Sequence, residues 1–184
     1  MRQISGALIV GGSIAFIVAA FMPITFAFIV QRDIEAVRSR PIEWAASQVL
    51  FGLGGAVTAA GLALLTLELR RGERGDVLGY FACAAITVGA ICWGAIVYAR
   101  YTLPLERVLA EPTLGKWFVM YTLLTQAALL AYGLVLVRAG YPRWLGFGTS
   151  GLATASLVGY FVFKDVPPFI QYVITLIIGL ALLL

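Results

Sequence analysis

The sequence predicts an all-α protein, a polytopic transmembrane bundle of six helices. Of its 184 residues, 61% are hydrophobic and only 12% are charged, and the mean hydropathy is +0.97. These values lie outside the range of ordinary soluble domains. The apolar residues form six long stretches separated by short charged links. The run from Val173 to Ile178 shows no alternation of apolar and polar residues, which favours helices over barrel strands.

The whole chain, residues 1–184, is expected to form a single transmembrane domain. Its spans are expected at residues 4–30, 44–67, 77–98, 117–137, 144–163 and 166–184. Each has about the twenty residues that a helix needs to cross a hydrocarbon core of about 30 Å. The first stretch is longer than the apolar region of a secretory signal peptide, so we expect it to be retained as a span. Pro23 predicts a kink within it.

One or two of the links are expected to form short interfacial helices. In the link 102–112, Pro104 suits the first turn of a helix, and Val108 and Leu109 fall on one face. The link 31–43 carries two apolar residues among alternating charges. A second short helix and a solvated turn are both compatible with that pattern.

The positive charges of the links bear on membrane orientation. Lysine and arginine residues divide almost equally between the two sides, so their number decides nothing. The tight basic turns at residues 70–74 and 138–143 are typical of cytoplasmic hairpins, and on that basis both termini are expected in the cytoplasm. The pI near 9.3 is interpreted as anchoring charge, and no nucleic-acid partner is expected.

Stripes of small residues spaced four apart predict close packing between helices. The stripes are Gly11, Ala15 and Ala19; Gly52, Ala56 and Ala60; and Gly151, Ala155 and Gly159. They predict a compact bundle. An alternative is that the first stripe docks a partner subunit.

Several kinds of chemistry are disfavoured by what the chain lacks. It has no histidine, which removes bis-histidine haem ligation, the usual zinc and copper sites, and catalytic triads built on imidazole. Cys83 and Cys92 lie nine apart and point to opposite faces of one helix. A carboxylate such as Glu68 or Asp165 could act at the interface, but neither has a partner for acid–base work. No catalytic residue, metal or cofactor is therefore expected.

Neutral polar residues inside the apolar stretches are the candidates for ligand binding. Gln126 is the deepest, and we group it with Tyr121, Tyr132, Gln171 and Trp93. Amides and hydroxyls in an apolar cavity suit a small, uncharged or amphipathic ligand. The same groups also serve as ordinary interhelical hydrogen-bond partners, at about 0.6 kcal/mol each. Both interpretations stay open.

The second half of the chain carries a resemblance. Residues 133–146 read Gly-Leu-Val-Leu-Val-Arg-Ala-Gly-Tyr-Pro-Arg-Trp-Leu-Gly, and Asp-Val-Pro-Pro-Phe at 165–169 opens the last apolar stretch. In these features the chain resembles uncharacterised bacterial six-helix integral membrane proteins, a family filed as a domain of unknown function. The resemblance implies a multi-pass protein of the bacterial inner membrane and implies no activity.

The expected function is non-enzymatic. We expect an accessory or scaffold subunit, or a binder of a lipid-like molecule, whose partners are membrane lipids, other membrane subunits or a second copy of the chain. The alternative is the substrate-binding component of a vitamin-type transporter. In length and helix number the chain is similar to the substrate-binding subunits of energy-coupling-factor transporters, whose first helix also carries small residues four apart.

Overall fold

The computed structural model describes residues 2–71, 77–163 and 167–184, and within them the chain is helical without any strand. Within the described residues, five helices are long and apolar enough to cross a membrane. They are α1 (Arg2–Phe21), α4 (Pro41–Arg71), α5 (Val77–Thr102), α7 (Pro112–Arg138) and α8 (Arg143–Phe163). The last apolar stretch forms α9 (Phe169–Leu183), which has only 15 residues. The all-α prediction is confirmed.

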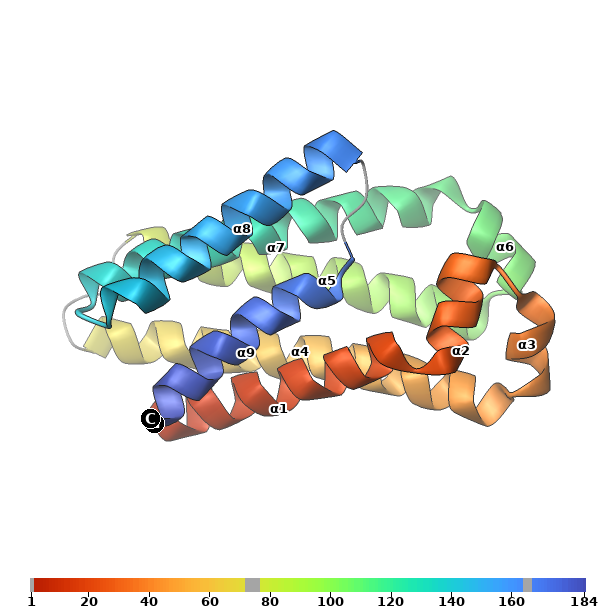
Figure 1. Ribbon diagram of the computed structural model, residues 1–184, viewed down its shortest axis with the longest axis horizontal. Coiled ribbons are helices and arrows are strands. Elements are labelled where there is room, and N and C mark those ends of the chain that lie inside the picture. The colour runs from red at the N-terminus through yellow and green to blue at the C-terminus, as the bar shows by residue number, and fades with distance from the viewer. Residues whose placement is uncertain (1, 72–76, 164–166) are drawn as a thin grey trace.

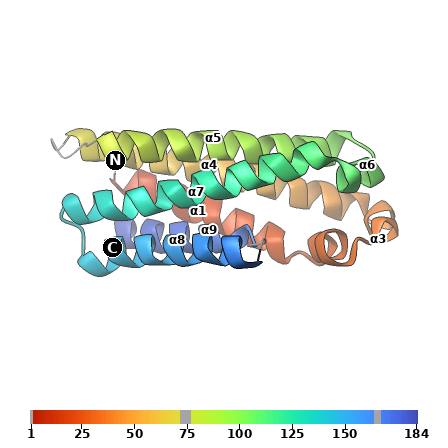
Figure 2. The ribbon, with the colours of Figure 1, turned by 90° about the horizontal axis from the view of Figure 1, so that it is seen from above.

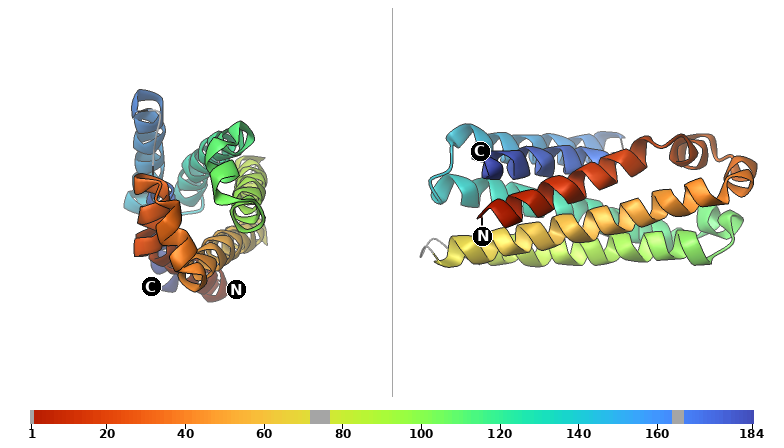
Figure 3. Two further views of the ribbon diagram at one scale, coloured as in Figure 1. Left: turned by 90° about the vertical axis from the view of Figure 1, so that its right-hand side faces the viewer. Right: turned by 90° about the horizontal axis from the view of Figure 1, so that it is seen from below.

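The long helices run side by side along one axis, as Figure 1 shows. Helix α1 packs against α4 and α9, α5 packs against α4 and α7, and α8 packs mainly against α7. Figure 2 shows the same order from above. Both chain ends lie at one end of the bundle, and the short helices gather at the other, which faces the viewer in the left panel of Figure 3.

The first apolar stretch, expected as one span over residues 4–30, is broken at Pro23. Helix α1 stops before it, and the chain continues as α2 (Pro23–Phe26) and a π-helix, η1 (Ala27–Gln31). Because proline has no N–H to donate to the carbonyl of Ala19, the Thr25 hydroxyl donates to that oxygen instead, at 2.7 Å. Arg32, with φ of 54°, then ends the π-helix in the left-handed conformation. The predicted kink is confirmed, and it is sharp enough to divide the helix.

Both links considered for short helices contain one. They are α3 (Ile34–Ser39) and α6 (Leu105–Ala110). The Asp33 carboxylate caps α3 by accepting a hydrogen bond from the Ala36 amide at 2.9 Å. Val37 of α3 and Val108 of α6 are buried in one apolar cluster with Ile24, Phe28 and Trp44. The two short helices are therefore packed onto the end of the bundle.

Most residues of the predicted small-residue stripes point away from the neighbouring helices. Gly11, Ala56, Ala60, Gly151 and Ala155 are exposed, and Ala15, Gly52 and Gly159 are half-buried. Of the nine residues only Ala19 is buried. A side-chain carbon placed on Gly11 or Gly151 would meet no atom within 4 Å. Most residues of these stripes therefore lie on the outside of the bundle, and the stripes do not make its close helix crossings.

Other glycines make the close crossings. A carbon on Gly12 of α1 would lie 2.8 Å from the carbonyl oxygen of Gly54 on α4, and Gly133 of α7 meets Gly146 of α8 in the same way. Gly6 of α1 packs against α9 at Gly179. In a sequence this rich in small residues, several faces of a helix carry the four-residue spacing. The contacting face is selected by the neighbouring helix.

Two sequence predictions lie partly outside the described residues. The basic turn at 70–74 includes residues 72–74, and the last expected span begins at Val166. Lys164 and Asp165 also fall there.

Candidate functional site

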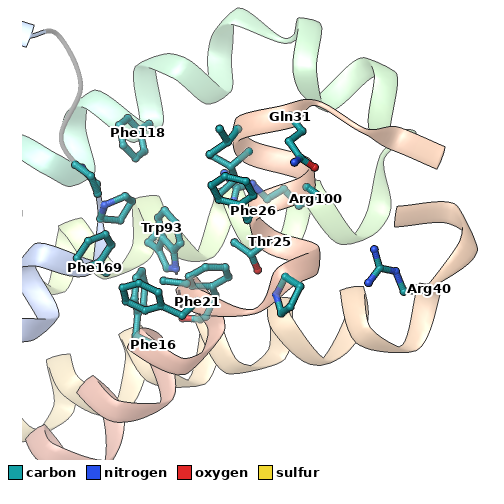
Figure 4. Close-up of a pocket in the computed structure, with 18 residues that line it drawn as sticks. Phe16, Phe21, Thr25, Phe26, Gln31, Arg40, Trp93, Arg100, Phe118 and Phe169 are labelled. Atoms are coloured by element: carbon teal, nitrogen blue, oxygen red, sulfur yellow. Dashed lines mark hydrogen bonds between the residues drawn. The ribbon is translucent and has the colours of Figure 1, made fainter. Parts of the chain in front are cut away.

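A cavity of about 820 Å³ lies where the first apolar stretch breaks and α9 begins. This volume falls within the range of about 300–1,000 Å³ typical of small-molecule sites. Figure 4 shows side chains from α1, α2, η1, α4, α5, α7 and α9 around it. Its lining is mainly apolar, with seven aromatic residues: Phe16, Phe21, Phe26, Phe51, Trp93, Phe118 and Phe169.

The shortness of α9 explains why space remains at this place. Fifteen residues rise only about 22 Å, whereas a full crossing needs about 30 Å. The helix begins beside the end of α1, where the rings of Phe21 and Phe169 lie 5.1 Å apart. Beyond this point α9 no longer covers the bundle, and α2 turns away from the axis of α1 (Figure 1). The cavity fills the gap that these two breaks leave.

The inner wall of the cavity is a rigid aromatic cluster. Phe16 stacks on Tyr172 with ring centroids 3.6 Å apart, and it meets Phe51 edge-on at 4.8 Å. The indole N–H of Trp93 donates to the carbonyl oxygen of Phe51 at 3.3 Å. Trp93 also packs against Tyr121 at 4.8 Å. Since these contacts link α1, α4, α5, α7 and α9, the wall is held by most of the bundle.

Arg100 brings a positive charge to this cavity. It belongs to the last turn of α5, and its guanidinium carbon lies 5.5 Å from the ring centre of Trp93 and 6.0 Å from that of Phe28. Its Nη1 atom is buried without a hydrogen-bond partner. None of the ion pairs found among the described residues includes it. The two aromatic rings position the guanidinium but leave its charge without a counter-ion.

The other polar residues of the lining are placed differently. Arg40 is exposed at the outer edge of the cavity, where Figure 4 shows it apart from the aromatic residues, and it pairs with Glu43 at 3.6 Å. Gln31 lies near Arg100 in the same view, at the end of the π-helix. The Thr25 hydroxyl is already engaged at the helix break. Arg100 is therefore the unengaged charge of the lining, as far as the described residues show.

The five predicted ligand-binding residues are all buried, with at most 1% of each exposed. They do not form one site. Only Trp93 lines the large cavity. The Tyr132 hydroxyl contacts Thr66 Oγ1 at 2.9 Å and donates to the carbonyl oxygen of Leu62 at 3.1 Å, a structural contact between α7 and α4.

Tyr121 and Gln171 line a second, much smaller cavity in the centre of the bundle. Its volume of about 10 Å³ is room for about one water molecule. The Gln126 side chain lines neither cavity, and both of its amide atoms are buried without a partner among the described residues. Ordered water is the usual partner of such groups.

Sequence reasoning counted Arg100 only as a link charge. A signal for it was present, because this arginine stands between Tyr98 and Tyr101 in an apolar run. A charge within such a run is uncommon and often functional. The aromatic wall had no comparable signal, since its members come from separate helices and look like ordinary core residues.

Among the described residues, no carboxylate, cysteine or histidine lines the large cavity. Within residues 2–71, 77–163 and 167–184, no three histidine, cysteine or acidic side chains gather as metal ligands would. Glu68 accepts a hydrogen bond from Ser5 at 3.0 Å at the opposite end of the bundle. Asp165 lies outside the described residues.

Comparisons with protein families, curated proteins and solved structures give no match for this chain. Its function is therefore argued from the geometry of the cavity.

Proposed function

We propose that this chain is a non-enzymatic multi-pass membrane protein that binds a lipid-like molecule in the aromatic cavity. The observation that carries the proposal is a cavity of about 820 Å³ with an almost continuous apolar and aromatic lining. An acyl chain gains little hydrophobic energy by leaving the bilayer, because lipid tails are already apolar. It gains dispersion contacts with walls that otherwise lack a partner. An amphipathic lipid fits such a lining better than a polar metabolite does.

We propose further that all six apolar segments lie in the bilayer and that α9 covers only part of its thickness. Arg2 Nε donates to the carbonyl oxygen of Leu182 at 3.1 Å, so the two chain ends lie at the same end of the bundle. An even number of passages produces that arrangement. The basic residues Arg138 and Arg143 belong to the same end, which supports placing both termini in the cytoplasm. The resemblance of the second half supports a bacterial inner membrane.

The transporter alternative has less support. A vitamin-type substrate needs a polar pocket, and the polar residues Tyr121 and Gln171 enclose only about 10 Å³. A role as an accessory or scaffold subunit is compatible with lipid binding. Leu152, Val158 and Phe161 of α8 are exposed, and this apolar face can meet lipid, another subunit or a second copy. The cavity is the more specific feature, and we base the proposal on it.

Filling the cavity tests the proposal. Ala20 lines the cavity, whereas Ala60 is exposed on α4 and lies outside it. The full-length chain and the variants Ala20→Trp and Ala60→Trp would be released from the membrane in mild detergent and measured by native mass spectrometry. We expect lipid to remain bound to the unchanged chain and to Ala60→Trp, and to be lost from Ala20→Trp.

Thermal unfolding of both variants controls for damage to the fold. Equal lipid retention by a folded Ala20→Trp and by Ala60→Trp would contradict the proposal. So would an unchanged chain that carries no lipid and takes up none when lipid is added.

A further inference from the structure

Arg100 has no counter-ion among the described residues, and the described carboxylates at its end of the bundle have other partners. Arg38 pairs with both Glu35 and Glu106. Glu43 pairs with Arg40, and the Asp33 carboxylate caps α3. The Glu111 side chain accepts from the Thr113 amide at the start of α7. No described carboxylate is therefore placed to neutralise Arg100.

A charge in this setting favours an anionic ligand. A guanidinium with a buried nitrogen and no hydrogen-bonding partner loses solvation without compensation. A carboxylate or a phosphate can replace the lost solvation with hydrogen bonds, because the planar guanidinium matches two oxygens of either group. The guanidinium carbon already lies against the rings of Phe28 and Trp93, so part of the conformational freedom of the side chain is lost before an anion binds.

The depth of the cavity suits an anionic head joined to an apolar tail. Arg100 stands two residues before the end of α5, at the end of the bundle where the short charged helices lie. Trp93 stands seven residues earlier, about 10 Å deeper along the same helix. From there the lining continues through Phe16 to Phe169 at the start of α9. A head at Arg100 would therefore place its chain along the aromatic wall.

We propose that the ligand is an anionic membrane amphipath, with a carboxylate or phosphate head held by Arg100 and its acyl chain among the aromatic residues. This inference rests on the proposed lipid-binding function and adds the charge of the head and the residue that recognises it. It commits to a lipid of the surrounding membrane as the source of the anion. A water-soluble anion is a separate outcome of the test.

The experiment compares two probes with the same chain, one with a charged head and one whose head is made neutral by a methyl ester. The full-length protein in detergent would be titrated with 9,10-dibromostearate and with its methyl ester, following bromine quenching of tryptophan fluorescence. Subtracting the signal of a Trp93→Phe variant isolates quenching at the cavity wall. We expect the carboxylate to bind at least about tenfold more tightly than the ester.

Variants assign that preference to one residue. Arg100→Gln removes the charge and should reduce the preference to about twofold or less, whereas Arg100→Lys should keep part of it. The matched control is Arg107→Gln, which makes the same charge change at an exposed position on α6 at the same end of the bundle. It should leave the preference unchanged.

Each result has a distinct meaning. Equal binding of acid and ester to the unchanged protein would overturn the inference and leave the lipid-binding function standing. Quenching by neither probe would overturn both. Displacement of dibromostearate by millimolar inorganic phosphate would assign Arg100 to a soluble anion and overturn the lipid as its source. A preference that survives in Arg100→Gln and disappears in Arg107→Gln would overturn the role of Arg100.

Discussion

Replacing each of two adjacent glycines with alanine distinguishes the observed helix-packing face from the one that the sequence pattern predicted. Gly12 and Gly11 are neighbours on α1, so Gly12→Ala and Gly11→Ala are the same chemical change in the same helix. At Gly12 the added carbon would lie 2.6 Å from the backbone nitrogen of Thr58 and 2.8 Å from the carbonyl oxygen of Gly54. At Gly11 it would meet nothing within 4 Å.

The expected free energies of unfolding follow from these distances. Ordinary contact begins at 3.4 Å, so at Gly12 the helices must separate by about 0.8 Å. The obstacle is backbone, which cannot rotate away. Overpacking of this kind costs about 1–3 kcal/mol. Alanine gains about 1 kcal/mol of helix propensity over glycine at either position. Because both variants share this gain, it cancels when their free energies of unfolding are subtracted. The remaining difference should equal the packing cost at Gly12, about 1–3 kcal/mol.

Unfolding by SDS in mixed micelles, followed by circular dichroism, measures both variants against the unchanged chain. We expect Gly11→Ala to be as stable as the unchanged chain or up to about 1 kcal/mol more stable. Gly12→Ala should be less stable than Gly11→Ala by the packing cost. Equal stability of the two variants would refute the packing argument, and a larger loss at Gly11 would restore the stripe predicted from the sequence.

Two further predictions concern the hydrogen bonds of one side chain each. Tyr132→Phe removes the contacts of that hydroxyl with Thr66 and Leu62 and should destabilise the bundle by about 0.6–1.7 kcal/mol in the same assay. Tyr98→Phe, at a ring that is 70% exposed, should have no effect, and an equal loss in both would contradict this. At the start of α7, the Thr113 side chain and amide lower the pKa of Glu111 below its ordinary 4.5. That contact should therefore stabilise the start of α7 above this pH and be lost as the pH falls through the lowered pKa. An NMR titration of Glu111 checks the pKa, and a pKa at or above 4.5 would disprove the effect. Amide protection at the start of α7, taken relative to the intrinsic exchange rate at each pH, should fall with the titration of Glu111 and become independent of pH in Glu111→Gln.

The helices were predictable from the sequence because helix formation in lipid is a local requirement. Every backbone amide must find its partner within the same segment, so length and hydropathy locate the long helices. The break at Pro23 was also predictable, since proline lacks the N–H that the preceding turn needs. The start of α9 also has a local cause, because Pro168 stands directly before its first residue and proline suits the beginning of a helix.

The candidate site was predicted poorly because polarity was taken as its signal. Gln126 and Tyr132 are the residues that attract attention in an apolar sequence, yet the Tyr132 hydroxyl joins two helices. The cavity is formed largely by phenylalanines on five elements, each of which looks like core. Arg100 was assigned to a link because the sequence does not show that α5 continues to Thr102.

The sequence by itself determined that the chain is a helical membrane protein, where its long helices lie, and which kinds of chemistry its composition disfavours. These properties depend on each segment separately, through hydrophobicity, backbone hydrogen bonding and the side chains available. Only the tertiary structure decided which face of each helix packs, where the cavity opens, and that Arg100 stands over Trp93 with no counter-ion in the described part of the chain. Those properties depend on distances between segments far apart in the chain, which local sequence patterns do not encode.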